Sequence, residues 1–193
     1  MSTKRDESFE QGPLAIVTGG SSGIGLAISK AFSKALIRVV NVDVKVPKES
    51  MDKRIRPIHC DVRSGKEVDQ LFHSCQGWGV PDFLVLNAGV GIHERLVDGD
   101  PEKWQQVYDT NVMGALRILR AFLPSMKKIK KGHVVFISSV ASEKPFASGG
   151  IYSSSKSALD TIAETLRIEE APHIKVSVVS PGITNSEFFE NEL

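Results

Sequence analysis

Tyr152 and Lys156 stand four positions apart in the stretch IYSSSKSALD, residues 151–160. If this stretch is helical, positions i and i+4 lie on the same face, so the phenol and the ammonium point into the same space. A nearby cation favours the phenolate, so Lys156 would lower the pKa of Tyr152 and make it a proton donor and acceptor near neutral pH. The spacing alone is equally typical of two ordinary helix residues, so other residues must build a site around it.

The elements that would position this pair alternate along the chain. Short runs rich in β-branched residues are separated by segments in which apolar residues recur at i, i+3, i+4 and i+7, as at 28–35, 68–75 and 112–119. The expected strands are 14–18, 38–43, 55–60, 82–87, 133–138 and 174–179. This order predicts an α/β fold, a doubly wound parallel sheet of at least six strands with helices on both faces. Such sheets bind ligands beyond the carboxyl ends of their strands.

Composition narrows the class of protein. The chain has 193 residues, of which 41% are hydrophobic and 24% are charged, as expected for one soluble globular domain. A net charge of +1 gives no electrostatic reason to expect a nucleic-acid or membrane partner. Two cysteines make no disulfide framework, and the five histidines show no paired metal-ligand spacing, so no metal is expected. A polar start without an apolar signal core indicates a reducing, cytoplasmic location.

A glycine-rich turn follows the first expected strand. The segment TGGSSGIG, residues 18–25, places Gly19, Gly23 and Gly25 at the opening of a helix. Glycine permits a tight turn and lets a phosphate approach backbone N–H groups at the positive end of that helix. A plain glycine turn is the alternative, but a strand before it, a helix after it and an acid about twenty residues later are typical of a dinucleotide site.

That acid is Asp43, at the end of the second expected strand. Its carboxylate can accept hydrogen bonds from the adenosine ribose hydroxyls and would repel a 2′-phosphate, so NAD is favoured over NADP. A capping or turn aspartate is the less favoured alternative. After the third strand, Asp61 could accept from the adenine amino group, or could equally be the N-cap of a helix beginning near Ser64.

Two further strand ends carry polar or small residues. The fourth strand ends in Asn87–Gly89, a turn small enough to let a cofactor pass close to the backbone. The fifth runs into Ser138 and Ser139, and Ser139 precedes Tyr152 by thirteen residues. A hydroxyl there can bind a substrate oxygen that the tyrosine protonates.

These motifs together resemble the short-chain dehydrogenase/reductase family in its single-domain oxidoreductase branch. They are TGGSSGIG, NAG at 87–89, Asn111, Ser139, YSSSK at 152–156 and PG at 181–182. The resemblance implies a Rossmann fold in which Tyr152 is the general acid and base, Lys156 holds the nicotinamide ribose and Ser139 orients the substrate oxygen. It also implies that Asn111 anchors a proton relay through its backbone. The catalytic residues expected are Asn111, Ser139, Tyr152 and Lys156. The cofactor-binding residues expected are Thr18, Gly19, Ser21, Ser22, Gly23, Ile24, Gly25, Asp43, Asp61, Val62, Asn87, Ala88, Gly89, Tyr152, Lys156, Pro181, Gly182, Ile183 and Thr184.

The function so implied is hydride transfer between NAD(H) and a secondary alcohol or ketone, without a metal. Residues 1–12 are expected to form a flexible tail, and residues 13–193 a single dinucleotide-binding catalytic domain. Members of the family commonly continue into a substrate-binding lobe and a seventh strand, which we expect this chain to lack. Two alternatives stay open: an NADP-linked carbonyl or hydroxy-acid reductase, and a cofactor-binding protein with little turnover. The resemblance also implies a homodimer or homotetramer formed through the helices near 109–128 and 152–170. The small-molecule substrate itself is not identified.

Overall fold

Six parallel strands form one sheet in the computed structural model, which describes residues 9, 11–46 and 52–184. Their order across the sheet is β3-β2-β1-β4-β5-β6, and every neighbouring pair is parallel. The strands are β1 Leu14–Thr18, β2 Arg38–Asp43, β3 Ile55–His59, β4 Phe83–Leu86, β5 Gly132–Ile137 and β6 Ile174–Val179. Each end lies within one residue of the expected position, so the predicted parallel sheet is confirmed.

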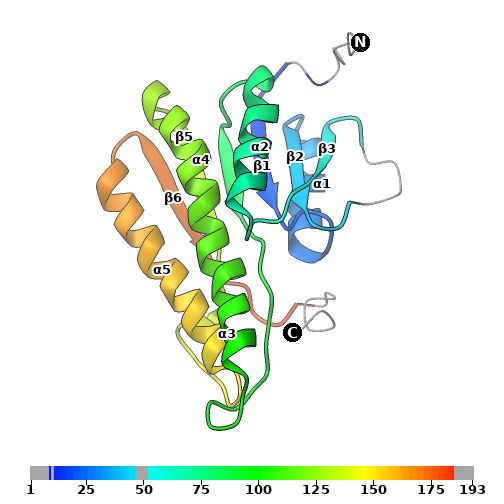
Figure 1. Ribbon diagram of the computed structural model, residues 1–193. Coiled ribbons are helices and arrows are strands. Elements are labelled where there is room, and N and C mark those ends of the chain that lie inside the picture. The colour runs from blue at the N-terminus through cyan, green and yellow to red at the C-terminus, as the bar shows by residue number, and fades with distance from the viewer. Residues whose placement is uncertain (1–8, 10, 47–51, 185–193) are drawn as a thin grey trace.

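Helices cover both faces of this sheet (Figure 1). They are α1 Gly23–Lys34, α2 Gly65–Cys75, α3 Pro101–Tyr108, α4 Gly114–Ile129 and α5 Gly150–Glu170. Apolar side chains of α2, α4 and α5 pack with one face of the strands in a single large core. Those of α1 pack with the other face in a smaller core. The arrangement is the doubly wound, Rossmann-like fold that the sequence predicts, and Tyr152 and Lys156 share α5, as their spacing requires.

A π-helical turn joins α3 to α4, so that the two form one long rod (Figure 1). It spans Asp109–Met113 and has the buried Asn111 at its centre. Before it, α3 begins at Pro101, and the Asp100 side chain caps the helix by accepting from the Glu102 amide at 3.0 Å. Apolar periodicity alone predicts a helix here but not the wider turn inside it. Such turns are rare and frequently lie at functional sites.

Phe9 corrects the expected boundary of the N-terminal tail. Its ring is only 1% exposed and packs edge-on against Trp78, with centroids 5.2 Å apart. Arg38 donates a hydrogen bond of 2.8 Å to the Phe9 carbonyl, and the Arg56 guanidinium lies 4.8 Å from the ring centre. The chain is therefore anchored to the core within the segment assigned to a flexible tail. Residues 1–8, 10 and 185–193 lie outside the described residues.

The position of the site follows from the strand order. From β1 the chain adds β2 and then β3 on one side, and it later returns to add β4, β5 and β6 on the other. The connections after β1 and β4 therefore diverge, which opens a crevice at their carboxyl ends. Within the described residues, no helix is long and apolar enough to cross a membrane.

Candidate active site

A cavity of about 940 Å³ lies at the carboxyl ends of the strands. It is lined by residues that follow all six strands, from Gly19 after β1 to Pro181 after β6. The predicted residues that line it are Gly19, Ser22, Gly23, Ile24, Asp43, Asp61, Val62, Asn87, Ala88, Gly89, Ser139, Tyr152, Lys156, Pro181, Gly182, Ile183 and Thr184. Thr18, Ser21, Gly25 and Asn111 are the predicted residues that stand behind this lining. One cavity thus contains both the glycine turn and the tyrosine–lysine pair.

Thr18 and Asn87 connect the ends of β1 and β4 beneath the cavity. The Thr18 hydroxyl donates to the Val85 carbonyl at 3.3 Å and accepts from the amides of Asn87 and Ala88 at 3.0 and 3.1 Å. In return, the Asn87 side-chain amide donates to the carbonyls of Thr18 and Gly19 at 2.9 and 3.0 Å. These bonds fix the glycine turn against the neighbouring strand end, so both line the same wall.

Gly19 has a backbone conformation that favours glycine. Its φ is +63°, and a Cβ placed there would lie 2.9 Å from the Ala88 Cα and from the Asn87 side-chain nitrogen. The close approach of the two strand ends thus depends on the absent side chain. Ser22, Gly23 and Ile24, where α1 begins, line the cavity beside this turn, and N–H groups at the start of a helix are suited to binding phosphate.

The Asp43 carboxylate is oriented by two backbone amides. One oxygen accepts from the Ser21 N–H at 3.0 Å and the other from the Lys45 N–H at 2.9 Å. Asp43 is half-buried and lines the cavity at the end of β2. Both oxygens keep lone pairs for hydroxyl donors, so the position fits a ribose-binding acid.

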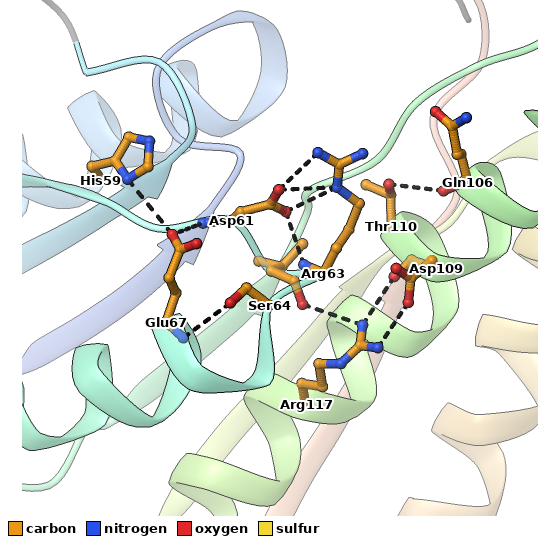
Figure 2. A network of polar contacts seen from close by, with 10 residues as sticks. His59, Asp61, Arg63, Ser64, Glu67, Gln106, Asp109, Thr110 and Arg117 are labelled. Atoms are coloured by element: carbon orange, nitrogen blue, oxygen red, sulfur yellow. Dashed lines mark hydrogen bonds and ion pairs between the residues drawn. The ribbon is translucent and has the colours of Figure 1, made fainter.

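Asp61 forms an ion pair with Arg63, which the sequence did not indicate. The guanidinium donates to both carboxylate oxygens, the shortest of these bonds being 2.7 Å, and the Arg63 amide donates to Asp61 at 2.9 Å (Figure 2). These bonds with Arg63 hold the pKa of Asp61 below its ordinary value. Ser64, not Asp61, caps α2 by accepting from the Glu67 amide at 3.2 Å. The capping alternative for Asp61 is therefore wrong, and its carboxylate stays at the cavity wall.

Arg117 on α4 connects the segment after β3 to the π-helical turn. Its guanidinium forms an ion pair of 2.8 Å with the Asp109 carboxylate and reaches the Val62 carbonyl at 3.4 Å (Figure 2). Val62 lines the cavity, whereas Asp109 begins the turn that contains Asn111. The Arg117 side chain therefore links Val62, at the cavity wall, to the turn that carries Asn111, a predicted catalytic residue.

Tyr152 and Ser139 meet at the cavity wall. Ser139 directly follows Ser138 at the end of β5 and begins a short 3₁₀ turn, in which its hydroxyl accepts from the Ala141 amide at 3.1 Å. Burial raises the pKa of Tyr152, and a hydrogen bond with the Ser139 side chain partly opposes that rise. The spacing of Tyr152 and Lys156 predicted that the lysine would lower this pKa. The net direction in the structure is the opposite, because removing the phenol from water disfavours the phenolate.

Lys156 is buried beneath Tyr152. It is 3% exposed, its ammonium donates to the Ile137 carbonyl at 2.9 Å, and it lies 5.8 Å from the centre of the Tyr152 ring. Burial lowers the pKa of Lys156 to about 8, and the nearby Asp160 carboxylate opposes this shift. The amine is therefore close to its titration midpoint at slightly alkaline pH, which suits a group that assists proton transfer.

Asn111 contributes from behind the cavity. Its side-chain oxygen accepts from the Val90 amide at 2.8 Å, while its nitrogen donates to the Val90 carbonyl and to the Ser155 hydroxyl, both at 3.0 Å. A Cβ added at Gly89 would lie 3.2 Å from the Asn111 oxygen and 3.6 Å from the Lys156 nitrogen. Asn111 thus fixes the loop after β4 against α5, close to the lysine.

Several of the residues that line the cavity after β4 and β5 are apolar. Val90, Val140, Ala141 and Phe146 line it together with His93 and Lys144. His93 and Phe146 pack edge-on with ring centres 5.4 Å apart, which joins the loop after β4 to the loop after β5. Among the described residues, no group of three His, Cys, Asp or Glu side chains could hold a metal ion.

Comparison with known proteins gives matches that span this site. The short chain dehydrogenase family profile matches residues 13–193. Farnesol dehydrogenase of Aedes aegypti is 35% identical over 199 residues, covering 94% of this chain and 81% of that protein. A probable NADP-dependent dehydrogenase of Haemophilus influenzae is 30% identical, covering 92% and 73% respectively. The crystal structure of a short chain dehydrogenase/reductase from Burkholderia phymatum, in complex with NAD, superposes with a TM-score of 0.84 at 26% identity. That superposition covers 94% of this chain and 69% of the other.

Proposed function

The chain belongs to the short-chain dehydrogenase family of oxidoreductases, and from that premise we propose that it interconverts a secondary alcohol and a ketone with NAD(H). The observation that carries the proposal is the meeting of Ser139, Tyr152 and Lys156 in the same cavity as the glycine turn. The cavity is large enough for a dinucleotide and a small substrate, and its walls present the donors and acceptors that each requires.

Proton transfer would take place at the Tyr152 oxygen. Ser139 and Tyr152 are hydrogen-bonded neighbours, so a carbonyl oxygen placed between them can accept from both. The raised pKa keeps Tyr152 protonated near neutral pH, which favours its action as an acid on a ketone. Lys156, with a pKa of about 8, lies below the ring and supplies positive charge when the phenolate forms. The nicotinamide, when bound, supplies or accepts the hydride.

Asp43 supports NAD as the preferred dinucleotide. Two backbone amides orient its carboxylate at the end of β2, where a 2′-phosphate would meet a fixed negative charge. A second candidate is an NADP-linked reductase. It is favoured by the cationic residue Lys45, which lines the cavity next to Asp43, and by the relative described as a probable NADP-dependent dehydrogenase.

The substrate would bind against the apolar residues that line the cavity after β4 and β5. Val90, Ala141 and Phe146 supply that surface, and His93 and Lys144 line the same cavity. A relative from Aedes aegypti is described as a farnesol dehydrogenase. We therefore propose a predominantly apolar alcohol or carbonyl compound rather than a strongly charged one.

The test combines binding with turnover in one preparation. NAD and NADP binding would be measured by calorimetry, and NADH oxidation would be followed against a panel of aliphatic and isoprenoid ketones and aldehydes. We expect tighter binding of NAD, and turnover that Tyr152→Phe abolishes while NAD binding is kept. Binding without any turnover would instead support the alternative of a cofactor-binding protein, and tighter binding of NADP would show that Asp43 does not decide the choice.

Two further expectations remain proposals. The homodimer or homotetramer would be checked by light scattering during size-exclusion chromatography. The cytoplasmic location agrees with two buried cysteines in the free thiol form, and fractionation of the source cells would test it.

A further inference from the structure

One peptide group of the glycine turn is hydrogen-bonded by side chains at both its carbonyl oxygen and its N–H. The Gly20 carbonyl accepts from the Asn41 side-chain nitrogen at 2.6 Å. The N–H of the same peptide, which belongs to Ser21, donates to the Asp43 carboxylate at 3.0 Å. Asn41 and Asp43 are two residues apart on β2, so their side chains extend from the same face of the strand. We call these two residues the peptide clamp.

Asn41 is an unusual residue for its position. It is 0% exposed within β2, where its neighbours Val39, Val40 and Val42 are equally buried. A buried amide lowers stability unless hydrogen bonds satisfy it. Here they do so, because the nitrogen donates to Gly20 and the oxygen lies 3.5 Å from the Ser21 hydroxyl. An apolar residue could fill this buried position without any hydrogen bond. The Asn41 amide is therefore explained by its bonds to the glycine turn and not by packing in the core.

The turn is also shaped around Asn41. A Cβ added at Gly20 would lie 2.6 Å from the Asn41 Cγ and 3.1 Å from its nitrogen. The Gly20 N–H points the other way, toward the Val42 carbonyl at 3.3 Å. Glycine at position 20 is therefore required by the presence of the Asn41 side chain, and the two residues form a matched pair.

From these contacts we propose that Asn41 is a positioning residue that sets both the affinity for the dinucleotide and the preference for NAD over NADP. The proposal rests on the proposed function of the cavity. Asn41 stands outside the cavity lining and acts through the Gly20–Ser21 peptide. That peptide is part of the glycine turn at the cavity, so holding it fixes the phosphate-binding backbone. Its N–H, which belongs to Ser21, also orients the Asp43 carboxylate.

The effect on nucleotide choice follows from the orientation of Asp43. With the clamp intact, the carboxylate faces the ribose site in one direction and excludes a 2′-phosphate. Without the Asn41 bond, the Gly20–Ser21 peptide can rotate and the Ser21 amide no longer restrains Asp43. The Asp43 carboxylate can then turn away from the ribose site. NAD would lose a hydrogen-bond acceptor for its ribose hydroxyls, and the 2′-phosphate of NADP would no longer be repelled by a fixed negative charge.

The experiment compares Asn41→Leu with the wild-type chain, using calorimetric Kd values for NAD and for NADP. Leucine has a similar volume but donates no hydrogen bond. We expect NAD affinity to fall at least tenfold, which corresponds to about 1.4 kcal/mol, and the ratio of NADP Kd to NAD Kd to fall at least threefold. Val39→Ala is the matched control. It removes buried volume from the same face of β2 without touching the clamp, and it should leave that ratio unchanged.

A second measurement keeps the test independent of folding losses. Gly20→Ala should lower the thermal midpoint because its Cβ meets Asn41, and Asn41→Ala should make room for that Cβ. The double variant should therefore be more stable than the sum of the two single effects predicts. If the double variant shows this non-additive stability but Asn41→Leu leaves the ratio of NADP Kd to NAD Kd unchanged, the inference about nucleotide preference is overturned.

The two proposals fail in different ways. A wild-type chain that binds neither dinucleotide would overturn the proposed function and this inference with it. Wild-type binding of NAD, matched by Asn41→Leu with equal affinity and an equal NADP to NAD ratio, would overturn only the inference. Additive effects of Gly20→Ala and Asn41→Ala on the thermal midpoint would also overturn it, since the matched pair would then not exist.

Discussion

Replacing Lys156 with methionine should make the protein more stable while removing a predicted catalytic group. The ammonium is 3% exposed, and its ordinary pKa of 10.5 falls to about 8 because burial disfavours the charged form. At pH 7 the folded chain must nevertheless protonate this amine. Methionine has a similar length and no charge, so the variant removes that unfavourable burial from the folded state.

The size of the effect can be worked from the lowered pKa. Each tenfold change in proton affinity is worth about 1.4 kcal/mol. Burial of charged Lys156 therefore lowers the free energy of unfolding by about 3 kcal/mol at pH 7. Loss of the hydrogen bond to the Ile137 carbonyl offsets about 1 kcal/mol. A net gain of about 2 kcal/mol should raise the thermal midpoint by roughly 6 °C for a chain of this size.

The gain should also depend on pH in a defined direction. Between pH 8 and 10.5 the unfolded chain keeps a proton on Lys156 that the folded chain releases, so the free energy of unfolding of the wild type rises with pH across this window. At pH 9.5 the unfavourable term is about 1.5 kcal/mol, which leaves the variant only about 0.5 kcal/mol more stable. Its advantage should therefore be largest near pH 7 and below.

Urea unfolding of both chains at pH 7 and at pH 9.5 would measure these differences. Lys175→Met is the matched control, because it makes the same substitution at an exposed position, on β6. The reasoning would be refuted by a Lys156→Met chain that is no more stable than the wild type at pH 7. It would equally be refuted by an advantage that stays constant to pH 9.5.

Three other expectations concern the glycine turn, the anchored N-terminal segment and the thiols. Gly25→Ala should reduce NAD binding at least tenfold in calorimetry, because its Cβ would overlap the Gly19 carbonyl oxygen; unchanged binding would contradict this packing. Phe9→Ala should lower the free energy of unfolding in urea by about 3–5 kcal/mol, because a 1% exposed ring is lost, whereas a truly free tail would give no change. Burial raises the pKa of Cys60 and Cys75 to about 12, so a thiol reagent at pH 8 should label neither until urea is added.

The regular parts of this fold could be predicted because local sequence determines them. Runs such as LAIVT and RVVNVD are fully or almost fully buried strands, and a continuous apolar run is what a sheet covered on both faces requires. The positions of Gly19, Asp43 and Ser139 followed, since each stands at the end of a strand or within two residues of it. Strand ends in a parallel sheet converge on one edge, so their proximity needs no knowledge of distant contacts.

Other features depend on contacts between distant segments and could not be predicted from local patterns. Asn41 has the same spacing as an ordinary strand residue, and only its bond to Gly20, 21 positions away, shows what it does. Phe9 is a single aromatic residue in a polar segment and gives no periodic signal. The pKa of Tyr152 rises rather than falls because the depth of burial, which spacing does not reveal, outweighs the favourable contacts.

The π-helical turn Asp109–Met113 also lets the long helical rod hold one extra residue without rotating α3 relative to α4. A π turn contains about one residue more than an α turn, so it acts as a one-residue insertion whose hydrogen bonds remain local. Each residue of an α-helix advances the side-chain direction by about 100°. An extra residue in an ordinary α-helix would rotate everything beyond it by that angle, whereas the wider turn absorbs the residue locally, so that α3 and α4 both keep their apolar faces toward the core. Removing one residue here would let the rod close into a continuous α-helix with α3 and α4 in nearly the same orientation, but the wider turn that directs Asn111 toward Val90 would be lost.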